Sequence, residues 1–147
     1  MASLYTSVLK DHVLDPLEAL LKSELGKIPI YYDREFRSRA NFFIRAIPIQ
    51  DQLDKPTTED QLRQYGVLLR LYRRTPGPYN KEKNLTQLIN YIDRIKRLIG
   101  NNSNYRPSGN YAWNDGTISR VNYQPELEEQ EQAFTAADLF FNCNVLI

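Results

Sequence analysis

The feature that most constrains the fold is the alternation of side chains over the last eleven residues, ADLFFNCNVLI. Residues two apart in a β-strand point to the same face, so this segment predicts a strand with one apolar side and one mixed side. We therefore expect the chain to be built into a sheet up to its final residue. The apolar side holds Leu139, Phe141, Cys143, Val145 and Ile147, and the mixed side holds Asp138, Phe140, Asn142, Asn144 and Leu146.

Four further segments predict strands, and two of them show the same alternation. Pro29, in the first of the four, is typical of an edge strand or of the start of a strand. The segments are residues 27–33, 41–49 (with Phe42, Ile44 and Ala46 on one side), 65–74 (with Tyr65, Val67, Leu69 and Leu71 on one side) and 117–126.

Two segments have apolar residues at helical spacing. The first covers residues 4–25 and is interrupted by Pro16, so it is either one helix or two, with the second beginning at Asp15 and Pro16. The second covers residues 84–100 and ends at Gly100. Its apolar stripe consists of Leu85, Leu88, Ile89, Ile92, Ile95 and Ile99.

The order helix, three strands, helix, two strands predicts an α+β fold in a single domain, residues 1–147. We expect a mostly antiparallel sheet of four to five strands with two main helices packed on one face. Polar connections are expected at residues 34–41, 50–64 and 101–116, and the last two are long enough to be functional or mobile.

The sequence offers little for catalysis. The one histidine, His12, would have to serve every Ser-His-Asp or Cys-His scheme. The one cysteine, Cys143, is predicted to be a small buried hydrophobic residue. No metal-ligand spacing and no phosphate-binding glycine loop occurs, although two-carboxylate hydrolysis stays open among 18 acidic residues. We expect no enzyme activity, no cofactor and no metal, and no membrane contact because no stretch of about 18 apolar residues is present.

Charge is distributed unevenly along the chain. All 19 Lys and Arg precede residue 121, and the charged residues of the segment that follows are all acidic. Such asymmetry suits head-to-tail packing of identical subunits. Clustered arginines and ten tyrosines also allow nucleic-acid binding, but the near-neutral total charge disfavours a dedicated binder. The arginines are Arg34, Arg37, Arg39, Arg70, Arg73 and Arg74, and the acids are Glu126, Glu128, Glu129, Glu131 and Asp138.

The order of elements and two local stretches resemble the tail terminators of long-tailed bacteriophages, the lambda-type tail-completion family. That family tends to end with an aromatic residue, small residues, an acid and an alternating apolar strand. The segments NFFIRAIPI and YGVLLRLYRR resemble its second and third strands with a variable loop between them. The matching terminal residues are Phe134, Thr135, Ala136, Ala137, Asp138 and Leu139, followed by Phe140 and Phe141.

The resemblance implies a hexameric ring that caps the head-proximal end of the tail tube and joins it to the neck. The implied partners are further copies of the chain, the tail tube protein and a neck or head-completion protein. DNA would pass through the lumen without sequence-specific contact. The implied location is the virion, after assembly in the host cytoplasm. The alternatives are another connector of the head and tail (an adaptor, head-completion or sheath-capping protein) and a nucleic-acid-binding accessory protein.

We predict which residues meet in contacts between subunits. The arginine-bearing segments are expected to face acids of the neighbouring copy, and the mixed side of the last strand is expected to meet another chain. Residues 51–64 are expected to form a contact arm. The predicted interface residues are Arg34, Arg37, Arg39, Arg70, Arg73, Arg74, Glu126, Glu128, Glu129, Glu131, Phe140 and Leu146.

Overall fold

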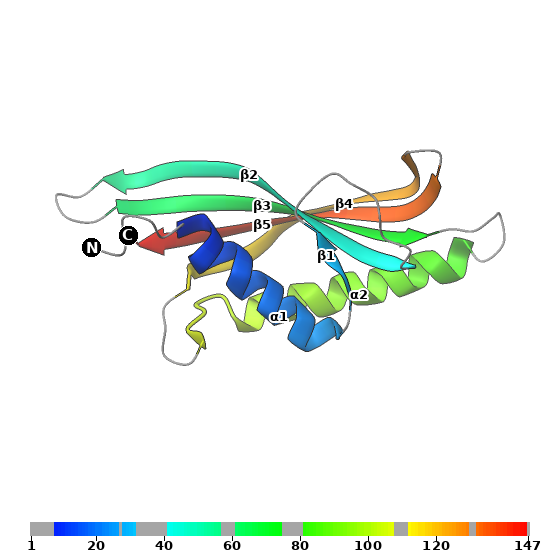
Figure 1. Ribbon diagram of the computed structural model, residues 1–147, viewed down its shortest axis with the longest axis horizontal. Coiled ribbons are helices and arrows are strands. Elements are labelled where there is room, and N and C mark those ends of the chain that lie inside the picture. Colours follow the sequence, from blue (N-terminus) through cyan, green and yellow to red (C-terminus); the bar gives the residue numbers. More distant parts are fainter. Residues whose placement is uncertain are drawn as a thin grey trace.

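In the computed structural model, the chain forms a five-stranded sheet with its helices packed on one face (Figure 1). The sheet has the order β1–β2–β3–β5–β4, and its elements confirm the predicted α+β class. The strands are β1 (Ile30–Tyr31), β2 (Phe42–Pro56), β3 (Gln61–Arg74), β4 (Asn114–Glu129) and β5 (Gln132–Leu146). The structure describes residues 8–26, 28–31, 41–56, 61–74, 81–107, 112–129 and 132–146.

All neighbouring strands are antiparallel except β1, which pairs parallel with β2 at Ile44 and Arg45. The sheet is therefore mixed at one edge. A parallel neighbour cannot be reached by a tight turn, and ten residues separate β1 from β2 in the sequence. β1 lies at the edge of the sheet and begins directly after Pro29, which agrees with both alternatives predicted for that residue, an edge strand or the start of a strand.

The prediction of a loop at residues 50–64 is wrong. β2 continues to Pro56 and β3 begins at Gln61, so most of this segment is a hairpin, while residues 57–60 lie outside the described part. The four long strands have 14 to 16 residues each, which corresponds to about 45–55 Å. The 21 residues of α2 (Lys81–Asn101) span only about 32 Å. The β2–β3 hairpin consequently projects beyond the helices, as Figure 1 shows.

The first helical segment is continuous through Pro16. It consists of a π-helical stretch, η2 (Leu9–Leu14), followed directly by α1 (Asp15–Leu25). A proline within a helix lacks an N–H donor and crowds the carbonyl one turn earlier. The wider π turn before Pro16 accommodates both effects, so the helical segment continues through Pro16. The N-cap of α1 is Leu14 rather than Asp15, and it makes no side-chain cap.

α2 begins at Lys81, three residues before the predicted start. Asn84 therefore lies inside the helix, where it is 5% exposed. Four residues of the predicted stripe, Leu88, Ile92, Ile95 and Ile99, are completely buried, whereas the expectation for Ile89 is wrong because its side chain is 37% exposed.

The main core lies between the helices and one face of the sheet. The predicted inward sides of the strands are confirmed, because every residue in those sets that the structure describes is buried there. The inward residues are Phe42, Ile44, Ala46, Tyr65, Val67, Leu69, Leu71, Leu139, Phe141, Cys143 and Val145. Ile147 lies outside the described residues.

The predicted loop at residues 101–116 is shorter than expected, since β4 starts at Asn114. Tyr105 and Trp113 form an antiparallel bridge, and the indole Nε1 of Trp113 donates to the carbonyl of Asn102 at 3.0 Å. Trp113 is completely buried. A Cβ atom on Gly116 would lie 2.5 Å from the indole Nε1, so this close approach requires glycine.

Candidate functional site: the outer face and the ends of the sheet

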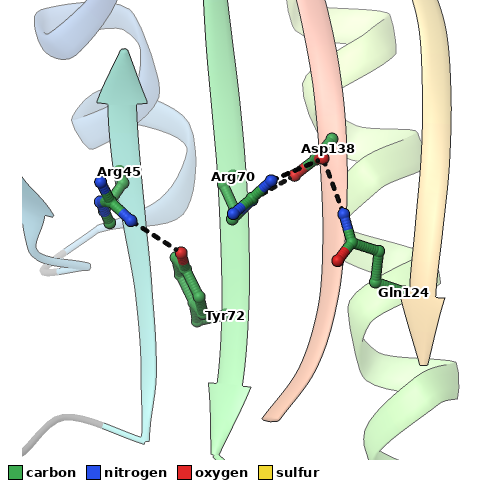
Figure 2. A network of polar contacts seen from close by, with 5 residues as sticks. All are labelled: Arg45, Arg70, Tyr72, Gln124 and Asp138. Carbon is green, nitrogen blue, oxygen red and sulfur yellow. Dashed lines mark hydrogen bonds and ion pairs between the residues drawn. The ribbon is translucent and has the colours of Figure 1, made fainter. Parts of the chain in front are cut away.

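Side chains that alternate away from α1 and α2 form what we call the outer face of the sheet. Its centre is a row of polar contacts that crosses β2, β3, β5 and β4 (Figure 2). The Arg70 guanidinium donates two hydrogen bonds to the Asp138 carboxylate, from Nε at 2.6 Å and from Nη2 at 3.0 Å. Gln124 donates to the same carboxylate at 2.9 Å, and Arg45 donates to the Tyr72 hydroxyl at 3.1 Å.

This row is a cross-strand clamp rather than a proton-transfer site. Asp138 is 6% exposed and Arg45 is 9% exposed. The hydrogen bond to Asp138 raises the pKa of Arg70 above its already high value, and burial lowers it by less. A bidentate pair of this kind is strong and geometrically specific. Arg70 and Asp138 come from strands that meet only after folding. The sequence therefore shows both charged residues but does not predict that they pair.

An aromatic cluster occupies the outer face on one side of this row. Phe43 stacks on Tyr72 with ring centroids 4.7 Å apart, and Phe134 meets both rings edge-on. All three side chains are at most 2% exposed. The guanidinium of Arg74 lies 5.6 Å from the Phe134 ring centroid, which favours a cation–π contact.

On the other side of the row, apolar side chains of the outer face are half-buried. Ile47, Leu68 and Phe140 lie opposite one another across β2, β3 and β5. The guanidinium of Arg120 lies 4.4 Å from the Phe140 ring centroid. Further along β5, Asn142 donates to the Ser119 hydroxyl at 2.7 Å. The mixed side predicted for the last strand is therefore partly satisfied within the chain.

The projecting end of the sheet carries apolar side chains that neither helix covers. We call this end the overhang: residues 49–56 of β2, 61–64 of β3 and 144–146 of β5. Ile49 is 49% exposed, Leu53 is 39% exposed and Leu146 is 49% exposed. Among the described residues, these are three of the five large apolar side chains that are exposed.

The predicted interface arginines and acids are only partly described. Arg34, Arg37, Arg39 and Glu131 lie outside the described residues, as do the side chains of Glu126, Glu128 and Glu129. The last three take backbone positions near the end of β4. Arg73 and Arg74 end β3.

The register places the ends of β3 and β4 together. Arg74 pairs with Phe134, and Phe134 also pairs with Leu127 of β4. Basic and acidic segments therefore gather at the same end of the sheet, two strands apart, opposite the overhang.

A cleft of about 340 Å³ opens between the end of β3 and α2. Arg73 lines it from the strand, and a polar stripe of α2 at helical spacing lines it from the helix: Gln87, Asn90, Tyr91 and Arg94. The apolar spacing that predicts the helix does not mark this stripe, because it lies on the polar side of α2. Its spacing i, i+3, i+4, i+7 was the signal that could have found it.

The two residues that sequence reasoning weighed for catalysis are both structurally engaged. His12 Nδ1 lies 3.2 Å from the carbonyl oxygen of Ala112. Burial raises the pKa of the Cys143 thiol to about 12, so the thiol is neutral near pH 7. Cys143 is 1% exposed, which confirms the predicted buried residue. Within the described ranges, no three His, Cys, Asp or Glu side chains gather to hold a metal ion.

No protein-family model matches the chain, and no curated sequence matches it either. In the part of the chain that the structure describes, none of the helices is both long and apolar enough to cross a membrane.

Proposed function

We propose that the chain is a structural assembly protein of a bacteriophage, a tail terminator that forms a ring on the head-proximal end of the tail tube. The observation that carries the proposal is the overhang with Ile49, Leu53 and Leu146 exposed. Exposed apolar side chains mark contact sites for another protein, and the register places Leu53 and Leu146 on opposite faces of the overhang. The element order and the one-sided helices agree with the resemblance on which the proposal is founded.

The edges of the sheet support contacts through the overhang and the faces rather than through added strands. β4, an edge strand, contains Pro125 and shifts its register with β5 at three places. β2, whose edge neighbour β1 has two residues, contains Pro48 and shifts its register with β3 at two places. Prolines and bulges in edge strands are devices that prevent edge-to-edge pairing. A ring built from these subunits would therefore be joined by side chains.

In this proposal the ring is a hexamer, and its two sides bind the tail tube protein and a neck or head-completion protein. DNA passes through its lumen without sequence-specific contact. The ends of β2 and β3 take the contact role that we predicted for residues 51–64, as paired strands instead of a loop. The same features suit another connector ring of the neck. A nucleic-acid-binding role is less well supported, because Arg70 is committed to Asp138.

The test is the mass of the purified protein by native mass spectrometry, together with electron microscopy of its particles. We expect closed rings from the wild-type chain. Ile49→Glu should abolish them by placing charge on the overhang, whereas Ile89→Glu, the same substitution at an exposed position of α2, should leave them intact. Monomers at high concentration, or equal effects of both substitutions, would contradict the proposal.

A second measurement addresses the location in the particle. Chemical cross-linking of intact virions should join this chain to the tail tube protein on one side and to a neck protein on the other. Cross-links to capsid-interior or host proteins alone would argue against a terminator.

A further inference from the structure

Three apolar side chains form a partly exposed patch on the outer face of the sheet. Ile47, Leu68 and Phe140 lie side by side on β2, β3 and β5, and all three are half-buried. Leu69 and Leu139, the next residues in β3 and β5, are completely buried in the core under the helices. Because adjacent strand residues point to opposite faces, the three side chains point away from the helices. We call Ile47, Leu68 and Phe140 the outer patch.

The overhang has a second apolar surface, on the inner side of the sheet. Leu53 lies opposite Arg63, and Arg63 lies opposite Val145, which belongs to the core under the helices. Leu53 therefore points to the inner side, at a place where its side chain is 39% exposed. The charges beside it compensate each other, because Arg63 Nη1 donates to Asp51 Oδ1 at 3.2 Å. The described side chains on this inner side consequently carry no net charge.

The two surfaces match in width and in chemistry. Both extend across β2, β3 and β5, so each is about 14 Å wide at the usual spacing of neighbouring strands. Sheets that pack face to face bury apolar side chains between them at a separation of about 10 Å. The two surfaces lie on opposite sides of one sheet, so a chain cannot bring its own pair together. A second copy provides a partner of the same width.

We infer that the inner side of the overhang of one copy packs on the outer patch of a second copy. This inference rests on the proposed ring of identical subunits and names the contact that joins them. Each copy offers the overhang to the neighbour on one side and the outer patch to the neighbour on the other side. Contacts between two different surfaces are heterologous, and this is the kind that closes into a ring.

The size of the contact explains why it needs a closed ring. About 20 Å of paired strand by about 14 Å gives roughly 300 Å² from each copy. The total of about 600 Å² is well below the roughly 1,200–2,000 Å² of stable pairwise interfaces, so two copies alone should dissociate. A subunit in a closed ring uses both surfaces, and its release breaks two contacts at once. We therefore expect native mass spectrometry to show monomers and rings with few dimers.

The test uses two full-length variants with opposite charges at the contact. Leu53→Glu places a negative charge on the overhang, and Leu68→Lys places a positive charge in the outer patch. Each variant alone should lose ring assembly, because a charge would then be buried against an apolar surface. An equimolar mixture should recover rings of alternating copies. In such rings the new carboxylate of one variant meets the new ammonium group of the other, and the remaining contacts are those of the wild type.

Ile89→Glu is the matched control, since it introduces the same charge at an exposed position of α2. It should assemble as the wild type does, and urea denaturation of each variant separates lost assembly from lost folding. If wild-type rings form and Leu53→Glu also forms them, the contact is wrong while the ring stands. A mixture of two folded variants that fails to recover rings equally overturns the contact. Rings of Leu53→Glu that fail to join tails would assign the overhang to the tail tube protein instead.

Cross-linking tests the contact separately from ring formation, including when one of the charged variants does not fold. One preparation carries Leu53→Cys and a second carries Leu68→Cys, while the native Cys143 is 1% exposed and stays unreactive. A bis-maleimide that spans about 10 Å, the separation of packed sheets, should join the two preparations at high protein concentration. Ile89→Cys in place of Leu53→Cys should give only background product, and equal yields would overturn the inference.

The salt dependence of the same cross-link tests the apolar character of the contact. Raising NaCl to about 1 M shortens the Debye length to about 3 Å and screens exposed charges. The yield of the cross-link between Leu53→Cys and Leu68→Cys should not fall, because the contact is apolar and its neighbouring charges are already paired. A loss of product at high salt would overturn the inference in favour of a contact between charged groups.

Discussion

The two faces of the sheet are stabilised in different ways, although the same strands form both. The inner face is filled with apolar side chains that pack against α1 and α2. The outer face buries Asp138 by pairing it with Arg70 and Gln124. Leu139 and Asp138 are neighbours in β5 and represent these two kinds of burial. Apolar packing tolerates substitution by another apolar side chain of similar volume. A buried charge, in contrast, destabilises the fold when its oppositely charged partner is removed.

The inner face should give the largest loss of stability. Leu139→Ala removes a completely buried side chain, and we expect the free energy of unfolding to fall by about 4 kcal/mol from lost burial and the remaining cavity. Urea denaturation measures it. Leu139→Met, which nearly conserves volume, should cost less than about 1.5 kcal/mol. A small effect of Leu139→Ala would mean that the helices do not pack tightly on β5.

The outer face should respond to a single change and recover with a second. Asp138→Ala leaves the Arg70 guanidinium without its carboxylate, and we expect a loss of about 3 kcal/mol. Replacing both partners, Arg70→Met with Asp138→Leu, should restore most of the stability because no unpaired charge remains. A double variant as unstable as the single one would show that the Arg70–Asp138 pair stabilises the fold by more than the mutual neutralisation of its two charges.

A smaller effect is expected where β4 begins. Gly116→Ala places a methyl group against the Trp113 indole, and we expect overpacking to cost about 2 kcal/mol. Trp113 fluorescence should shift as the ring moves. Gly100→Ala is the control, since a Cβ atom there meets nothing within 4 Å. Equal stability of the two variants would contradict the close approach.

The last effect concerns Cys143 and appears only at high pH. Burial raises its pKa from 9.0 to about 12, so the unfolded thiol ionises before the folded one. Its contribution to stability is present below pH 9 and is lost as the pH rises towards 12. Between pH 9 and 11 the unfolding free energy of Cys143→Ala should fall less steeply than that of the wild type. Parallel pH curves would show that the thiol does not contribute.

The contrast between the faces also explains what the sequence could predict. Apolar alternation predicted which side of β2, β3 and β5 faces the helices, because burial on one face selects that pattern. It missed the ends of β2 and β3, where the sequence shows no regular alternation of apolar and polar residues that would mark a strand. Residues 50–56 and 61–64 therefore had the composition of a loop.

The polar part of the site was beyond prediction for a different reason. Arg70 and Asp138 are 68 residues apart in the sequence, and only the register of β3 with β5 brings them together. The cleft depends likewise on the packing of α2 beside the end of β3. The resemblance to tail terminators gave the hypothesis of function, and the exposed overhang and the outer patch now give it residues to test.

The position of β5 in the sheet has a consequence for how the protein is made. β5 is the last strand in the sequence, yet it lies between β3 and β4. A growing chain that has not yet released β5 from the ribosome has a β2–β3 hairpin whose inner strand lacks a neighbour. Contacts so distant in sequence form slowly, and exposed strand edges of this kind are prone to aggregation before they are paired. The domain should therefore fold in one late step, after β5 has been synthesised, with chaperone demand concentrated before that strand pairs.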